Sequence, residues 1–464
     1  MRALIEDIAS QTTTQLNGRV AAISGSMVEV CGPVFAFSIG MRLSARLDTA
    51  LDGEPQALPL EIVALRDDRA MCMAYEGVEG LRRGALVDVV ASGNTLRPGE
   101  DWLGRIVDGL GAPIDNFGVL QNGGSACPVR AKPPAPAVRG RVGQPVDLGV
   151  KAINTFTTMC EGQRMGIFAG SGVGKSVLMS MLARNADFDV VVIGLIGERG
   201  REVKEFIEDD LGTEGLKRAC VVVATSDEPA LKRRQAAYTA MTIAESFRNR
   251  GKRVLLMMDS VTRFAMAQRE IGLAAGEPPT TKGYTPSVFA ELPKLLERAG
   301  PGAHDVGSIT ALFTVLVEGD NHNEPVADAV RGILDGHIVM DRAIAERGRY
   351  PAIDVLKSVS RTMPNCVPMD VRPLLTKARH LMSTYADMED LIRLGAYRKG
   401  SDPAVDTSIE LNPAFEAFLT QQKGEAMGLA ESYEALAQIV ATASPGSDAD
   451  TPSDTSRTEV AAAS

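Results

Sequence analysis

The spacing of hydrophobic positions changes along the chain and divides it into regions of different secondary structure. Between residues 18 and 92, short runs of β-favouring residues are interrupted by Gly, Pro and Asp. The runs 60–65 and 70–75 flank the polar stretch 66–69, a pattern that predicts a β-hairpin. Short strands at regular intervals, without helical segments between them, are typical of a small β-barrel. We therefore expect a β-barrel domain over residues 18–92.

The next region, residues 93–373, has apolar runs that alternate with helix-like segments. The later runs are β-rich and almost continuously apolar, as expected for strands that are covered on both faces. An alternation of strands and helices predicts a parallel sheet in an α/β domain. The expected strands are 164–168, 189–196, 219–224, 253–258 and 308–317.

The two ends of the chain have patterns of their own. Residues 374–443 are dominated by helical spacing and predict a C-terminal helical domain. Residues 444–464 are mostly Ser, Asp, Thr, Pro and Ala, so we expect a disordered tail. In the N-terminal extension, residues 1–17, apolar side chains repeat at helical spacing over 1–8. Two interpretations stay open there: an amphipathic helix for a membrane or a partner, and a frayed surface helix, which we favour because the segment is short and not basic.

Composition narrows the class of protein. The chain has 464 residues, 45% of them hydrophobic and 23% charged, which is ordinary for a globular protein. Its net charge of −10 argues against a nucleic-acid coat protein. The six cysteines form no C-x-x-C pair and lie far from the four histidines, so we expect reduced thiols rather than a zinc site or a disulfide framework. We also expect neither a signal peptide nor a membrane span, because no long apolar run is present.

A glycine-rich segment follows the expected strand 164–168 and precedes a helix-forming run, the context of a phosphate-binding P-loop. Its glycines let backbone N–H groups turn inward around phosphate oxygens, and the helix N-terminus adds partial positive charge. Lys175 can reach the β- and γ-phosphates, while the Ser176 hydroxyl can ligate Mg²⁺. The first position is Ala169 where the consensus has Gly, and a small residue still permits close packing there. The predicted nucleotide-binding residues are Ala169, Gly170, Ser171, Gly172, Val173, Gly174, Lys175, Ser176 and Val177.

Two carboxylates follow expected strands of the same sheet. Asp259 ends the run 253–258, and in a parallel sheet that end faces the nucleotide crevice, where Asp259 would hold Mg²⁺ through its water shell. Glu198 follows the run 189–196 and could orient the attacking water. Without the neighbouring motifs, each residue has another interpretation: Asp259 as an N-cap or turn residue, and Glu198 as a partner in a surface ion pair with a neighbouring Arg. Arg263 lies four residues after Asp259, so a helical turn would bring both to the site.

These segments resemble those of the hexameric rotary-type ATPases. The matching stretches are 162–164, the P-loop, 197–202, 259–263, 286–290 and 317–320. Within this group the chain is most similar to the type III secretion and flagellar export ATPases, on the stretches 167–176, 323–338 and 349–356. The resemblance extends from about residue 18 to about residue 422.

The resemblance implies a RecA-like P-loop α/β core with a parallel sheet, a β-barrel before it and a helical domain after it. It implies ATP hydrolysis with Mg²⁺ in a homohexamer with sites at the subunit interfaces. Lys175, Glu198, Arg199 and Arg263 look like the family's catalytic residues, with Ser176 and Asp259 toward Mg²⁺. Arg361 looks like the finger that a neighbouring subunit donates, and Tyr350 looks like the aromatic residue that packs on adenine.

For the family, the implied process is type III export of flagellar proteins. Its implied partners are an export regulator, a stalk protein, membrane proteins of the export gate, and chaperone–substrate complexes that the ATPase releases and unfolds. The implied location is the cytoplasm, with peripheral association at the inner membrane of the flagellar base, and no nucleic acid is involved.

Alternative functions share parts of this pattern. A virulence-type secretion ATPase has a similar core, and we favour the flagellar branch on overall similarity. An F- or V-type catalytic subunit lacks support because the acidic D-E-L-S-E-E-D helix of the F-type subunit is not found. A non-catalytic nucleotide-binding subunit would lack the carboxylate of Glu198. An RNA translocase is disfavoured because the chain is acidic and the barrel is poor in aromatic residues.

Overall fold

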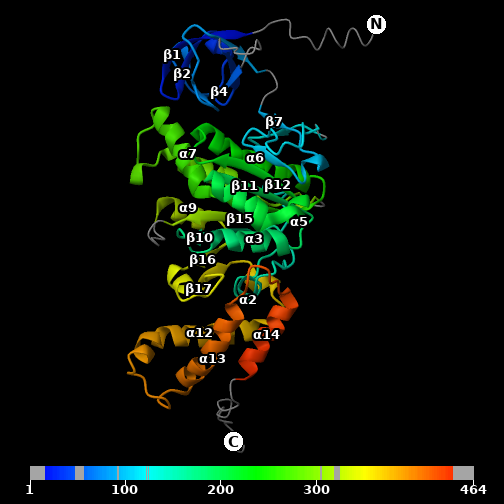
Figure 1. The fold of residues 1–464 in the computed structure, drawn as a ribbon, viewed down its shortest axis with the longest axis vertical. Helices are drawn as coiled ribbons and strands as arrows, with labels where there is room; N and C mark the ends of the chain where they lie inside the picture. The colour runs from blue at the N-terminus through cyan, green and yellow to red at the C-terminus, as the bar shows by residue number, and fades with distance from the viewer. Residues whose placement is uncertain are drawn as a thin grey trace, which may run out of the picture.

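The computed structural model describes residues 16–47, 57–90, 94–121, 123, 125–303, 306–317 and 324–442. The segment 1–8, expected to be helical, and the tail 444–464 lie outside the described residues. Along the longest axis of the molecule, a β-barrel, a central α/β region and a helical region follow one another in chain order (Figure 1). This is the fold class that the sequence predicts.

The N-terminal barrel is antiparallel and closed, with the strand order β1-β2-β5-β4-β3-β6. The expected hairpin is confirmed, because Arg66 and Arg69 pair at its tip and Asp67 adopts the left-handed turn conformation with φ 48°. Apolar side chains such as Val28, Leu43 and Leu60 fill its interior. The strands are β1 (Asn17–Ser24), β2 (Met27–Cys31), β3 (Arg42–Arg46), β4 (Ala57–Arg66), β5 (Arg69–Ala74) and β6 (Leu86–Val89).

The central sheet has the order β17-β16-β10-β15-β13-β11-β12-β8, with β14 beside β15. Neighbouring strands from β16 to β8 are parallel, and β17 and β14 pair antiparallel. The expected strands are confirmed as β10 (Arg164–Ala169), β11 (Val190–Glu198), β12 (Ala219–Thr225), β13 (Arg253–Asp259) and β15 (Ser308–Leu316). The sequence did not indicate β8 (Ile106–Asp108), β14 (Gly300–Pro301), β16 (Gly336–Met340) or β17 (Ile353–Ser360). A short pairing of β7 (Thr95–Leu96) with β9 (Cys127–Pro128) lies outside this sheet.

Helices cover both faces of the sheet, which explains its continuously apolar strands. Alternate residues of β11 enter two separate cores, with Val191 and Ile193 in one and Val190 and Val192 in the other. The first core includes α2 (Lys151–Phe156) and α3 (Lys175–Asn185), and the second includes α6 (Ala230–Arg248), α7 (Val261–Ala274), α8 (Pro286–Leu296) and α9 (Pro325–Ile333). The shorter helices are α4 (Gly200–Glu205), α5 (Gly212–Lys217), α10 (Arg342–Glu346) and α11 (Met363–Cys366).

The C-terminal region is helical, as expected, and packs on the first core. It consists of α12 (Arg372–Arg393), α13 (Pro403–Leu419) and α14 (Leu429–Ala441). Buried side chains from all three helices, among them Leu381, Phe415 and Leu436, join the core of α2 and α3. Among the helices of the described ranges, none is both long enough and apolar enough to cross a bilayer.

The expectation of reduced thiols is wrong for two cysteines. Cys160 and Cys366 are joined in a disulfide, with Cα atoms 6.6 Å apart and a sequence separation of 206. Cys31, Cys72, Cys127 and Cys220 are free thiols. The pairing depends on a tertiary contact between the segment before β10 and helix α11, so the spacing of cysteines in the sequence could not indicate it.

Candidate nucleotide-hydrolysis site

The P-loop connects β10 to α3 at the carboxyl edge of the parallel sheet. Gly172 and Gly174 have φ of 77° and 89°, left-handed conformations that side chains rarely adopt. A Cβ atom on Gly174 would also lie 3.3 Å from the ring of Tyr350. Ala169 is 1% exposed and packs in the sheet core, where a small apolar residue is tolerated. The loop therefore has the backbone geometry that a phosphate cradle requires.

A cavity of about 790 Å³ opens beside this loop. Its walls come from the P-loop, the end of β11, the first turns of α7 and the segment before α8. Val173 is buried and does not line it. The predicted residues that line it are Gly170, Ser171, Gly172, Gly174, Lys175, Ser176, Val177, Glu198, Arg199 and Arg263.

Lys175 lies between the two predicted carboxylates. Its ammonium forms an ion pair with Asp259 and lies 3.5 Å from Glu198 Oε1. These acids end adjacent parallel strands, β13 and β11, so they meet at the same edge of the sheet. Burial disfavours the charged lysine, but the charges of Asp259 and Glu198 prevail and raise the pKa of Lys175.

Glu198 has an environment suited to proton transfer. Its side chain is 15% exposed, and this burial is the main reason that its pKa rises to about 7. The negative charge of Asp259 raises the pKa further, while Lys175 and Arg263 act against the rise. A carboxyl group with a pKa near neutrality can accept a proton from water at physiological pH.

Arg263 reaches the cavity from the first turn of α7. The side chain of Ser260 caps this helix by accepting a hydrogen bond from the Arg263 backbone N–H at 3.3 Å. Gly197, with φ 71°, allows a close approach, because a Cβ atom there would lie 2.9 Å from Arg263 Cβ. Among the residues that the structure describes, none accepts a hydrogen bond from the buried Nε of Arg263. Arg199 differs: its side chain is 81% exposed at the mouth of the cavity, where it pairs with Glu202.

The other two predicted residues lie apart from the Lys175 cluster. Tyr350 is 44% exposed and lines a smaller hollow against Ser171 and Gly172 of the P-loop. Arg361 follows β17 and donates a hydrogen bond to the carbonyl oxygen of Arg331 at 3.3 Å. Arg361 lines neither of these cavities, so within one chain it does not join the other site residues.

Several residues of the site were not predicted from the sequence. Thr314 Oγ1 donates a hydrogen bond to Asp259 Oδ1 at 2.6 Å, but it stands inside the apolar strand β15 without a local signal. Arg342 follows β16 and donates a hydrogen bond to the Ser171 carbonyl at 3.2 Å. Its position after a parallel strand could have indicated it. Tyr284 and Glu324 line the cavity and are hydrogen-bonded to each other at 3.1 Å.

Comparison with known proteins agrees with this geometry. The nucleotide-binding domain of the ATP synthase alpha/beta family matches residues 149–360, and the T3SS EscN ATPase C-terminal domain matches residues 367–438. The flagellum-specific ATP synthase of Caulobacter vibrioides is 58% identical over 445 residues, which cover 95% of this chain and 99% of that protein. The chain belongs to the flagellar and type III secretion ATPase family.

Relatives in this family come from both branches. The type 3 secretion system ATPase of Xanthomonas euvesicatoria is 45% identical, over 94% of this chain and 97% of its own. The assembled ATPase EscN from the type III secretion system of enteropathogenic E. coli superposes with a TM-score of 0.84 at 42% identity, over 91% of this chain and 100% of its own. Membership of the family makes this chain a P-loop ATPase.

Proposed function

We propose that this chain hydrolyses ATP to ADP and phosphate and that hydrolysis drives the export of flagellar proteins. The observation that carries the hydrolysis proposal is the convergence of Lys175, Glu198 and Asp259 beside the glycine-rich loop. The export role is supported by the 58% identity to a flagellum-specific ATP synthase, against 45% to a type 3 secretion system ATPase.

Mg²⁺ is the cofactor we propose. Ser176 offers a hydroxyl in the cavity wall, and Asp259 offers a carboxylate oriented by Thr314. Hydroxyl and carboxylate oxygens are the donors that Mg²⁺ prefers, usually one or two from the protein together with substrate phosphates and water. When bound, the ion would neutralise charge on the β- and γ-phosphates.

The residues of the cavity divide the work of hydrolysis. The N–H groups of residues 170–176 and the ammonium of Lys175 hold the phosphates. Glu198 orients a water molecule and accepts its proton as the oxygen attacks the γ-phosphorus. Arg263 and Arg199 stabilise the negative charge of the transferring group. Tyr350 offers a flat, partly exposed ring for the adenine.

The pKa of Glu198 leads to a prediction on pH. We expect kcat/KM to rise with pH through about 7 and then to level off, because a protonated Glu198 cannot accept a proton from water. Below that value kcat/KM should fall about tenfold for each pH unit. Steady-state rates between about pH 6 and about pH 8 measure this profile, and a flat profile would contradict Glu198 as the base.

The site requires a second subunit under this proposal. Arg361 does not line the cavity of its own chain, and in a homohexamer the Arg361 of one subunit would reach the nucleotide of the next. EscN has been solved as an assembled ATPase and in complex with its central stalk EscO. By analogy, a homohexamer with a stalk protein is the state we propose for this chain.

The remaining partners belong to the export apparatus. We propose a regulator, the export-gate membrane proteins and chaperone–substrate complexes, which hydrolysis helps to release and unfold. The site of action would be the cytoplasmic face of the inner membrane at the flagellar base. Flagellar hook and basal-body genes beside the gene for this chain would support this proposal, and needle-complex genes would contradict it.

The central test measures ATPase activity against oligomer size. Because each site needs two subunits, phosphate release per chain should rise with protein concentration and follow the assembled fraction measured by mass photometry. Specific activity that stays constant down to dilutions containing only monomers would contradict the shared site. Absence of ATP turnover in the assembled protein would contradict hydrolysis itself.

A further inference from the structure

Helix α7 extends from the nucleotide cavity to the β-barrel. Its residues Thr262, Arg263, Met266 and Arg269 line the cavity. On its other side, Ala267 and Ile271 share a buried cluster with barrel residues that include Met27, Met73 and Tyr75. At the helix end, Arg66 of the barrel donates a hydrogen bond to the Ala275 carbonyl at 2.6 Å. One helix therefore contacts both the candidate reaction centre and the N-terminal domain.

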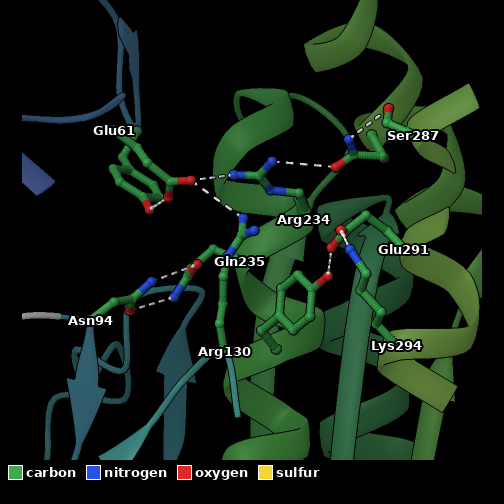
Figure 2. Close-up of polar contacts among 11 residues, drawn as sticks. Glu61, Asn94, Arg130, Arg234, Gln235, Ser287, Glu291 and Lys294 are labelled. Atoms are coloured by element: carbon green, nitrogen blue, oxygen red, sulfur yellow. Dashed lines mark hydrogen bonds and ion pairs between the residues drawn. The ribbon is translucent and has the colours of Figure 1, made fainter. Parts of the chain in front are cut away.

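A buried carboxylate anchors this contact on the barrel side. Glu61, on β4, is 2% exposed and accepts hydrogen bonds from Arg234 at 2.6 Å and from Arg130 at 3.3 Å (Figure 2). The Tyr75 hydroxyl donates a further hydrogen bond to the same carboxylate. A charged group that is excluded from water is strongly destabilising unless it is paired, so the ion pair with Glu61 fixes the position of Arg234 on α6.

The chain of contacts continues from Arg234 into α7 and α8. Arg234 Nη1 donates to the side-chain oxygen of Gln268 at 3.3 Å, and the Gln268 amide donates to Ser287 Oγ at 3.0 Å. The Ser287 backbone N–H in turn donates to Glu277 at 3.1 Å. Through these bonds, Ser287 at the start of α8 is tied to Gln268 of α7 and to Glu277, so both ends of the loop that joins α7 to α8 are held together. That loop carries Lys282 and Tyr284, which line the nucleotide cavity.

We propose that Glu61, Arg234 and Gln268 are positioning residues through which the β-barrel holds α7 and the following loop in place for ATP hydrolysis. None of the three lines the cavity, so their effect on turnover passes through the cavity residues of α7 and the following loop, such as Arg263 and Tyr284. The inference rests on the proposed hydrolysis and adds to it a link between the barrel and turnover. A small displacement of a group that stabilises the transition state is enough to slow the reaction.

A matched pair of variants tests the link. Gln268→Met removes the two hydrogen bonds of a buried amide at similar volume. Gln235→Met does the same one residue after Arg234, where the amide exchanges two hydrogen bonds with Asn94, just before β7 and outside the barrel (Figure 2). We expect the two variants to lose Tm by similar amounts. Only Gln268→Met should have a kcat about tenfold lower than wild type, while its KM for ATP stays within about twofold of wild type.

A conservative variant and a structural readout complete the test. Gln268→Glu keeps an acceptor for Arg234, and the Ser287 hydroxyl can donate to it, so kcat should return to within about threefold of wild type. Amide hydrogen exchange over 261–266 should quicken in Gln268→Met and not in Gln235→Met, whether or not ATP is hydrolysed. The proposal would be overturned if the two Met variants lost kcat equally, or if amide hydrogen exchange over 261–266 had the same rate in both. Loss of hydrolysis in wild type would instead overturn the proposed function.

Discussion

Replacing Glu198 by Gln is expected to lower kcat for ATP hydrolysis by about 10² to 10⁴-fold while ATP still binds. The amide cannot accept the proton of the attacking water, whereas Lys175 and the glycines of the loop are unchanged. Phosphate release measures the loss of turnover, and isothermal titration with ATP measures retained binding. Turnover close to that of wild type would remove Glu198 from the mechanism.

A carboxylate on the neighbouring helix α4 supplies the control for this experiment. The Glu205 side chain is 51% exposed, pairs with Arg201 and does not line the cavity. Glu205→Gln removes the same charge at a position where water screens it. We expect kcat of this variant to stay within about threefold of wild type, so that a large loss in Glu198→Gln is due to the position of Glu198 and not to the loss of one negative charge.

Arg361→Ala is expected to lower kcat of the assembled protein by about 10³ to 10⁵-fold, the range reported for arginines that reach a transferring phosphoryl group. Within the described part of the chain the Arg361 guanidinium donates an exposed hydrogen bond to the Arg331 carbonyl, so its removal should leave the fold intact. Thermal melting and mass photometry check the fold and the assembly, and phosphate release measures the activity. Activity near that of wild type would contradict the assignment of Arg361.

Mixed assemblies separate a residue donated by the neighbour from one that acts in its own chain. In a mixture of equal amounts of Glu198→Gln and Arg361→Ala subunits, a complete site forms where an Arg361→Ala subunit supplies Glu198 and its neighbour, a Glu198→Gln subunit, supplies Arg361. This arrangement occurs at about a quarter of the head-to-tail interfaces. Some activity should therefore return on mixing, although each variant alone is inactive. If Arg361 acted on the nucleotide of its own chain, no mixed interface would be complete and activity would not return.

The ends of the buried strands were the most predictable part of the site. Strands covered on both faces are apolar throughout, so the polar residues Glu198 and Asp259 mark where β11 and β13 end. Parallel pairing then places them at one edge with the P-loop, which is also what the structure has. The position of Arg263 followed from a helical turn after the strand, and α7 indeed begins at Val261.

Elements without such a periodic signal were not predictable. The strand β8 has only three residues, too few for an alternating pattern, and β17 is an edge strand of mixed burial. Thr314 acts on Asp259 from inside an apolar strand, and Gln268 acts on Arg234 across two helices. Such contacts depend on tertiary packing between distant segments. The domain limits and the roles of the individual site residues stay predictions.

The two acids of the site, Glu198 and Asp259, lie at the ends of buried strands of the closely packed central sheet. The strand residues before Glu198 and Asp259 are buried almost without exception, and close-packed interiors shift little under load. Conformational change during turnover would therefore fall on the residues around these strands, such as the exposed Arg199 and Arg361 and the half-exposed ring of Tyr350. The two carboxylates would keep a fixed spacing while these side chains move.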